Sequence, residues 1–216
     1  MLLPEFCEEL FYIKKVNLFE NSFKNYLEKV YEYNILAIQK WLKRLNKNYT
    51  IKKLKNLEDL SLFNNQLTEI PTQLFLPNLQ IFDLSFNRLT SILDIRLNFP
   101  NLQRLSISNN NLTKIPSLNL PNLQYLDLSY NQLTEIVSLN LPNLLELDLQ
   151  YNQLTKIQNL DLPNLQTLYL NTNQLTELPT LSLIPNLQHL FLYNNRLTEN
   201  NKKYLRSLKI NCLYFN

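Results

Sequence analysis

Apolar and polar residues alternate in short runs along most of the chain. In the stretch LPNLQYLDLSYNQLTEI, residues 120–136, Leu126 and Leu128 alternate with Tyr125 and Asp127. Successive side chains of a strand point to opposite faces, so the two leucines share one face and the residues between them share the other. Each such run therefore predicts a short strand with one buried and one exposed face.

The same unit recurs seven times. The pattern L-x-x-L-x-L-x-x-N-x-L-T begins at Leu57, Leu79, Leu102, Leu123, Leu144, Leu165 and Leu187, at intervals of 21 to 23 residues. Six of the seven units are preceded by Pro-Asn. One unit cannot bury its apolar face alone, so the repetition predicts coils that stack around a continuous core.

The repeated polar residues have structural roles in this stack. The ninth position is Asn in every unit: Asn65, Asn87, Asn110, Asn131, Asn152, Asn173 and Asn195. An amide at the inward turn can satisfy backbone groups of adjacent coils, so we expect an asparagine ladder. The Pro-Asn pairs predict turns, and the short return segments leave room on the convex side only for extended or 3₁₀ structure.

These motifs resemble the leucine-rich repeat family, in the short form common in bacteria, with LTEIP or LTKIP after the Asn. The resemblance covers residues 57–198. It implies an α/β solenoid, a horseshoe with a parallel β-sheet on its concave face. We accordingly divide the chain into an N-terminal helical cap (1–56), seven repeats (57–199) and a C-terminal cap (200–216).

The two ends depart from the repeat. Apolar residues at three- and four-residue spacings predict an amphipathic helix over residues 19–45, straight or else bent or split near Asn34. A shorter helix from Pro4 to about Lys15 is expected before it. At the other end, the pattern predicts a helical turn around residues 201–207 and a last strand over residues 208–210.

The composition excludes several classes of protein. The chain has no glycine, which phosphate-binding loops and dinucleotide turns require, so both of these enzyme classes are excluded. Turns with positive φ are expected to use Asn or Asp instead. Cys7 and Cys212 lie at opposite ends; a long-range disulfide is conceivable, but two reduced thiols fit better.

Nothing in the sequence predicts a membrane span or a secretory signal. No apolar run reaches about 18 residues, and Glu5, Glu8 and Glu9 stand where a signal peptide has positive charge. We therefore expect a protein of a cytoplasm, or one delivered into a host cytosol without a classical signal.

Charge is divided unevenly along the chain. Residues 1–56 carry 11 basic and 6 acidic side chains, whereas residues 57–199 carry 6 basic and 12 acidic ones. Nucleic-acid binding needs clustered Lys and Arg, so the acidic middle argues against it. The sequence predicts a protein partner instead.

Candidate catalytic chemistry is sparse. The one histidine, His189, is too far from Cys7 for a Cys–His pair and leaves only a pair with Cys212 open, and no Cys/His cluster has metal-ligand spacing. Asp127 and Asp148 should lie on adjacent strands, where they could act as acid and base or hold a cation. We favour an acidic patch for a partner, and expect neither an enzyme nor a metal or other cofactor.

The variable positions of the strands define a candidate partner-binding surface on the concave face. It combines an acidic middle with surrounding aromatic side chains, a combination that suits a protein interface, and two arginines, of which Arg88 follows the repeated Asn. The candidates are Asp83, Phe86, Arg88, Arg104, Tyr125, Asp127, Tyr130, Glu146, Asp148, Tyr151, Tyr169, Phe191 and Tyr193.

The sequence thus predicts a non-enzymatic protein-binding module, monomeric on its own. The repeats are similar to those of leucine-rich repeat effectors that intracellular bacteria deliver into host cells, which implies a role in regulating or inhibiting a partner. An alternative is a ubiquitin-ligase adaptor, because LPEF at residues 3–6 and Trp41 faintly resemble an F-box. A catalytic ligase domain would need more chain than residues 199–216 provide.

Overall fold

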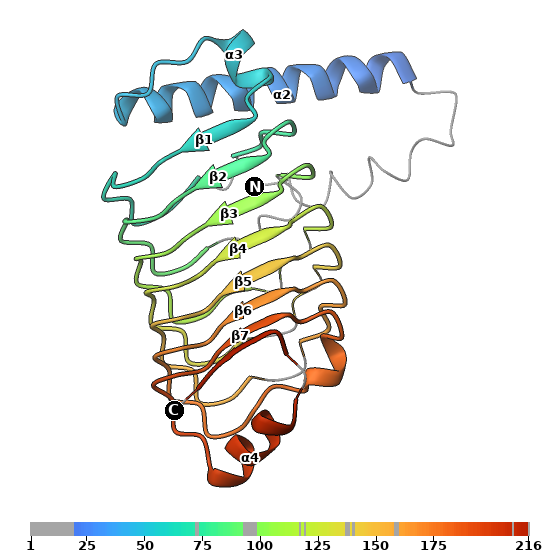
Figure 1. Cartoon of the computed structure of the whole chain (residues 1–216). Helices are drawn as coiled ribbons and strands as arrows, with labels where there is room; N and C mark the ends of the chain where they lie inside the picture. Colours follow the sequence, from blue (N-terminus) through green and yellow to red (C-terminus); the bar gives the residue numbers. More distant parts are fainter. Residues whose placement is uncertain are drawn as a thin grey trace.

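Eight short parallel strands lie side by side on one face of a curved stack of coils (Figure 1). The structure is a computed structural model that describes residues 20–71, 74–92, 99–116, 118, 120–136, 139, 141–157, 160–208 and 210–215. The strands are β1 (Asp59–Ser61), β2 (Ile81–Asp83), β3 (Arg104–Ser106), β4 (Tyr125–Asp127), β5 (Glu146–Asp148), β6 (Thr167–Tyr169), β7 (His189–Phe191) and β8 (Cys212–Tyr214). Their spatial order follows the chain, which confirms the predicted parallel solenoid.

Leucine side chains fill the interior of the stack in columns. The middle residue of each strand from β1 to β7 is buried, as is the leucine or isoleucine two positions later. In β4 these are Leu126 and Leu128, both fully buried. Because each strand pairs with the next in register, every leucine packs against its equivalent one coil away.

The repeated asparagine forms the expected ladder between coils. The Oδ1 of Asn131 accepts a hydrogen bond from the backbone N–H of Leu112 in the preceding coil (3.0 Å), and its Nδ2 donates to the carbonyls of Ile107 (3.0 Å) and Leu128 (3.1 Å). The equivalent asparagines of neighbouring coils make the same bonds. One buried amide thus satisfies backbone groups of two coils.

A second asparagine ladder, which the sequence did not reveal, follows the Pro-Asn turns. Asn122 donates through Nδ2 to the carbonyl of Pro100 in the preceding coil (3.0 Å), and Asn143 donates to Pro121 (2.7 Å). The same bond recurs at the other Pro-Asn pairs. The Pro-Asn pair therefore joins successive coils in addition to making a turn.

The N-terminal cap covers the first coil. Helix α2 (Glu20–Arg44) is continuous past Asn34, lies across the β1 end of the stack (Figure 1) and buries Ile35, Ile38 and Leu42. A second helix, α3 (Ile51–Lys55), was not predicted; it begins at Thr50, whose side chain accepts from the backbone N–H of Lys53. The helix expected over residues 4–15 lies outside the described residues.

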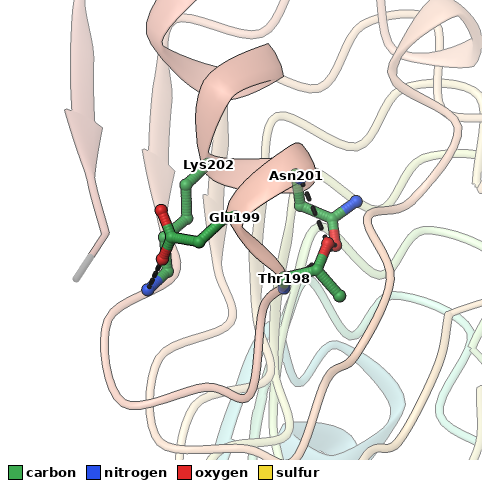
Figure 2. Close-up of polar contacts among 4 residues, drawn as sticks. All are labelled: Thr198, Glu199, Asn201 and Lys202. Atoms are coloured by element: carbon green, nitrogen blue, oxygen red, sulfur yellow. Dashed lines mark hydrogen bonds and ion pairs between the residues drawn. The ribbon is translucent and has the colours of Figure 1, made fainter.

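The C-terminal cap begins with helix α4 (Glu199–Ser207), which confirms the helical turn predicted there. Thr198 and Asn201 form a capping box at its start, and Lys202 pairs with Glu199 at 3.0 Å (Figure 2).

The last strand differs from the prediction. The segment 208–210 was expected to form it, but the helix continues to Ser207 and the strand is β8 at residues 212–214. Ile210, Leu213 and Phe215 there repeat the apolar spacing of a coil. On the return segments, the 3₁₀ helix η2 (Leu181–Leu183) confirms the expected local structure, while the boundaries set at residues 56 and 199 stay predictions.

The buried ladder should carry more stability than the exposed one. Asn131→Ala leaves several buried backbone groups without partners, and we expect it to lower the free energy of unfolding by about 3 kcal/mol. Asn122→Ala removes one exposed bond of the same type and should cost about 1 kcal/mol or less. Urea denaturation of both variants measures the difference. Equal losses of unfolding free energy would contradict the larger contribution expected from the buried ladder.

Candidate functional site

The strands present their variable side chains in columns on the concave face, hereafter the concave surface. The first and third residues of each strand, and the residues two and three positions after its end, contribute the columns. Arg104, Tyr125 and Glu146 are neighbours in one column, and Asp127 and Asp148 are neighbours in another. The structure therefore brings these five predicted site residues together, and we call them the central polar cluster.

Charge and ring contacts hold the central polar cluster together. The guanidinium carbon of Arg104 lies 4.8 Å from the centre of the Tyr125 ring, a cation–π contact. Arg104 is the one Lys or Arg among the strand residues β1–β8, whereas Asp59, Asp83, Asp127, Glu146 and Asp148 are acidic. The strands therefore carry an excess of negative charge.

The strand-end aspartates also have a structural role. Asp127 Oδ1 accepts from the backbone N–H of Ser129 (3.0 Å) and from its hydroxyl (2.6 Å), and Oδ2 accepts from Ser106 (3.1 Å). Asp83 makes the equivalent bonds with Ser85 and Ser61. These carboxylates close the turn after each strand, so their presence alone does not require a partner.

Burial makes the charge of the central polar cluster costly. Asp148 is only 8% exposed, and this burial raises the pKa of its carboxyl to about 6, with Asp127 and Glu146 adding to the rise and the Gln150 N–H bond opposing it. Burial and then Asp127 raise the pKa of Glu146, against the lowering effect of Arg104. Burial and the same carboxylates raise the pKa of Tyr125 to about 12.

Aromatic rings stack along the concave surface in separate groups. Tyr130 and Tyr151 stack with ring centres 4.2 Å apart and planes at 10°. Tyr169 and Phe191 stack at 4.6 Å, and Phe191 stacks in turn on Tyr214 at 5.2 Å. The predicted aromatic residues thus do not form one continuous patch.

Two residues of this surface were missed in the candidate set. Tyr214 was excluded because the last strand was placed too early, although the alternation of Ile210, Leu213 and Phe215 marks one more coil. Phe63 is not in the candidate set either; its ring lies 5.0 Å from that of Phe86. Column-wise comparison of aromatic residues would have found both.

A hollow of about 360 Å³ opens beside the three-ring stack. Its lining has Tyr169, Phe191 and Tyr214 on one side, Gln150, Asn171 and Tyr193 on the other, and Cys212 from a third column. Asn171 Nδ2 donates to Gln150 Oε1 (2.9 Å) and to the Tyr193 hydroxyl (3.1 Å). The hollow is therefore aromatic on one side and polar on the other.

The residue before each ladder asparagine adopts a left-handed backbone conformation. Asn64, Asn109 and Asn194 hold this position with φ of 53° to 56°, as predicted for a chain without glycine. Phe86, Tyr130, Tyr151 and Thr172 hold it too, with φ of 52° to 56°. The expectation that only Asn or Asp would serve is wrong at these four coils, and bulky or β-branched side chains are strained there.

The remaining candidates lie apart from the central polar cluster. Phe86 follows β2, at the α2 end of the sheet, where Asp83 is the last residue of that strand. Arg88 is exposed in the turn after Asn87, outside the strands. The structure does not bring these three residues together with Glu146 and Asp148, and their part in a partner site stays a prediction.

Of the residues considered for catalysis, the structure places His189 on β7 in register with Cys212 on β8. His189 Nδ1 lies 3.3 Å from the hydroxyl of Thr167. Within the described ranges, no three His, Cys, Asp or Glu side chains gather where they could hold a metal ion. Residues 3–6 lie outside the described part, and Trp41 packs partly buried against the core of the cap.

A second hollow, of about 490 Å³, lies at the edge where the strands begin. It is lined by the Pro-Asn ladder and by the glutamines two positions later, among them Gln103 and Gln124. It contains none of the candidate site residues, and no column comparison of strand positions would have found it.

Comparison with known proteins decides the family. The family model for leucine-rich repeats in pairs matches residues 55–97, 100–141 and 142–183, and the model for a single leucine-rich repeat matches residues 186–208. The chain belongs to the leucine-rich repeat family. The predicted resemblance is thereby confirmed, over most of the length for which it was proposed.

Two solved structures are similar to this leucine-rich repeat protein. YopM from Yersinia pestis, described as a leucine-rich effector protein, is 30% identical with a TM-score of 0.54, over 66% of this chain and 45% of that one. YopM from Yersinia enterocolitica is 32% identical with a TM-score of 0.49, over 66% of this chain and 39% of that one. The chain thus spans less than half the length of either. Curated proteins gave no match.

The helices described in this leucine-rich repeat protein include none that is long and apolar enough to cross a membrane.

Asp148 should make stability depend on pH. Its carboxyl pKa rises from 3.8 to about 6 on folding, so the folded state binds the proton more tightly, and stability present below pH 4 is lost as pH rises through 6. We expect Asp148→Asn to stabilise the protein relative to wild type by on the order of 2 kcal/mol more at pH 7.5 than at pH 4.5.

Denaturant titrations at the two pH values measure this difference. Asp161→Asn, which removes an exposed carboxylate outside the strands, serves as the charge-matched control. The same stability difference between Asp148→Asn and wild type at both pH values would contradict the assignment.

Proposed function

We propose that this leucine-rich repeat protein is a binding module that engages a protein partner on its concave surface. It acts by binding, with no cofactor, metal or nucleic acid, and as a monomer on its own. The candidate residues are those predicted from the sequence, together with Phe63 and Tyr214, which stack on them.

The observation that carries this proposal is the placement of tyrosines in left-handed backbone. Tyr130 and Tyr151 have φ of 52° and 53°, where Asn109 and Asn194 serve other coils without a bulky side chain. Their rings remain 45% and 38% exposed, so burial does not repay the strain. Strain held at an exposed position favours a functional use of the side chain, and tyrosine is enriched among residues that anchor interfaces.

Charge supports a partner of opposite sign. In the central polar cluster, Glu146 and Asp148 lie near one another and are partly desolvated. Arg104 is the one Lys or Arg side chain in the strands β1–β8. A basic surface on the partner would relieve this repulsion and guide its approach. Tyr151 follows β5, which carries both carboxylates, and Tyr130 follows β4, which carries Asp127.

The similarity to YopM supports a role as an effector. That protein is described as a leucine-rich effector, and the identity over the shared part is 30%. We infer that this chain likewise works inside a host cell, in a cytosolic compartment, where it regulates or inhibits its partner. The partner itself has to be found by experiment.

Asparagine at the two strained positions provides a selective test. Tyr130→Asn with Tyr151→Asn removes both rings. Relief of the strain at two residues opposes the loss of one ring stack, each at about 1 kcal/mol. We expect the free energy of unfolding to stay within about 1 kcal/mol of wild type, while affinity capture of partners from host-cell lysate falls at least tenfold.

The control replaces exposed tyrosines elsewhere. Tyr33→Ala on α2 and Tyr204→Ala on α4 remove two well exposed rings outside the concave surface and should leave capture unchanged. Capture by the asparagine variant at the wild-type level, with intact folding, would move the binding site away from the tyrosine stack.

A further inference from the structure

The hollow beside the three-ring stack has the chemistry of a site for one planar cation. The rings of Tyr169, Phe191 and Tyr214 are nearly parallel, with planes at 12° and 7°. Each inner face is therefore covered by the next ring. The outer face of Tyr169 turns toward β5, where its register partner is Asp148.

The step from β5 to β6 thus places a short carboxylate in register with the first ring of the stack. Asp148 binds Gln150 through both its backbone N–H (3.0 Å) and its side-chain Nε2 (2.9 Å). A carboxylate has about four lone-pair sites, so acceptor capacity remains for a donor that lies on the ring. Asp127, the register partner of Asp148 on the preceding strand β4, adds negative charge.

Asn171 supplies a second acceptor. Its side chain is 1% exposed, and both bonds that it makes use Nδ2, to Gln150 and Tyr193. Asn171 belongs to the lining of the hollow. Its amide oxygen is an acceptor, so it suits a ligand that brings an N–H group.

The charge of the lining excludes anions and favours cations. Lys and Arg are absent from the residues that line the hollow, so a phosphate or an acidic peptide would find no counter-charge. A cation gains from the aromatic rings and the Asn171 amide of the lining, and from the negative charge of Asp148, which lies behind the lining residue Gln150 and is bonded to it. Guanidinium is planar and stacks on aromatic rings with several donors in a fixed fork, whereas ammonium is a strongly hydrated point charge.

We propose that the hollow between the Tyr169–Phe191–Tyr214 stack and Asn171 binds an arginine side chain of the partner, with the guanidinium on the outer face of Tyr169 next to Asp148. This inference rests on the proposed function and specifies the partner's chemistry at one point. The Tyr130–Tyr151 stack contributes separate contacts.

A short peptide tests the site directly. The labelled full-length chain is titrated with acetyl-Gly-Arg-Arg-Gly-amide while the NMR signals of the Asn171 side-chain amide and the Tyr169 ring are followed. We expect both signals to move and the dissociation constant to rise about tenfold for Tyr169→Leu. Tyr169→Phe keeps the ring and should keep the affinity.

Peptides with altered side chains separate the guanidinium from mere charge or shape. Replacement of both arginines by citrulline, which is isosteric but neutral, should abolish binding, and replacement by lysine should weaken it severalfold. Tyr204→Leu on α4 is the matched control and should bind as wild type. Equal binding of the citrulline peptide, or shifts confined to residues outside the hollow, would overturn the inference.

This outcome is distinguishable from failure of the proposed function. Loss of partner capture in the Tyr130→Asn, Tyr151→Asn variant together with no discrimination between arginine and citrulline would reject the arginine site alone. Undiminished capture by that variant would reject the tyrosine stack as the interface, whatever the peptide binds.

Discussion

The buried asparagine amide is the interaction on which the rest of the structure depends. Each one joins the backbone of its own coil to that of the coil before it, as Asn131 does with Leu128 and Ile107. The bonds leave no freedom for a coil to slip along its neighbour, because a shift of one residue would expose the leucines and orphan buried polar groups. Strand register, leucine columns and surface columns all follow from this one contact.

The same constraint creates the conflict from which function is inferred. The ladder asparagine needs a left-handed residue before it, and a chain without glycine meets this need most easily with Asn. Coils with Asn109 and Asn194 do so, whereas Tyr130 and Tyr151 bring rings to the same place. The ladder asparagine and the candidate binding residue are thus neighbours in the chain. The asparagine is the same in every coil, whereas the residue before it is a tyrosine in two coils although Asn would be less strained there.

Sequence periodicity predicted the fold because each coil repeats the same burial pattern. Strands and the ladder follow directly from the leucine and asparagine positions, as in Leu126, Leu128 and Asn131. The position of strand β8 was not predicted, because Phe215 takes the place of the leucine that completes the pattern in other coils. The bonds of Asn122 and its equivalents were not predicted, because the Pro-Asn pair already indicates a turn and the turn alone accounts for both residues. The residues of the concave surface were predictable by column; the gaps between their rings depend on side-chain directions.

The continuous helix α2 and the short strand β8 have a consequence for how the stack comes apart. Each coil contacts only the coils beside it, so stability is a sum of nearest-neighbour terms. A coil in the interior breaks two interfaces when it opens, whereas a coil at an end breaks one, so opening at an end costs less free energy. We therefore expect unfolding to begin at one end and to continue coil by coil. The lifetime of the native state then depends on the two caps and not on the tyrosines that are proposed to bind the partner.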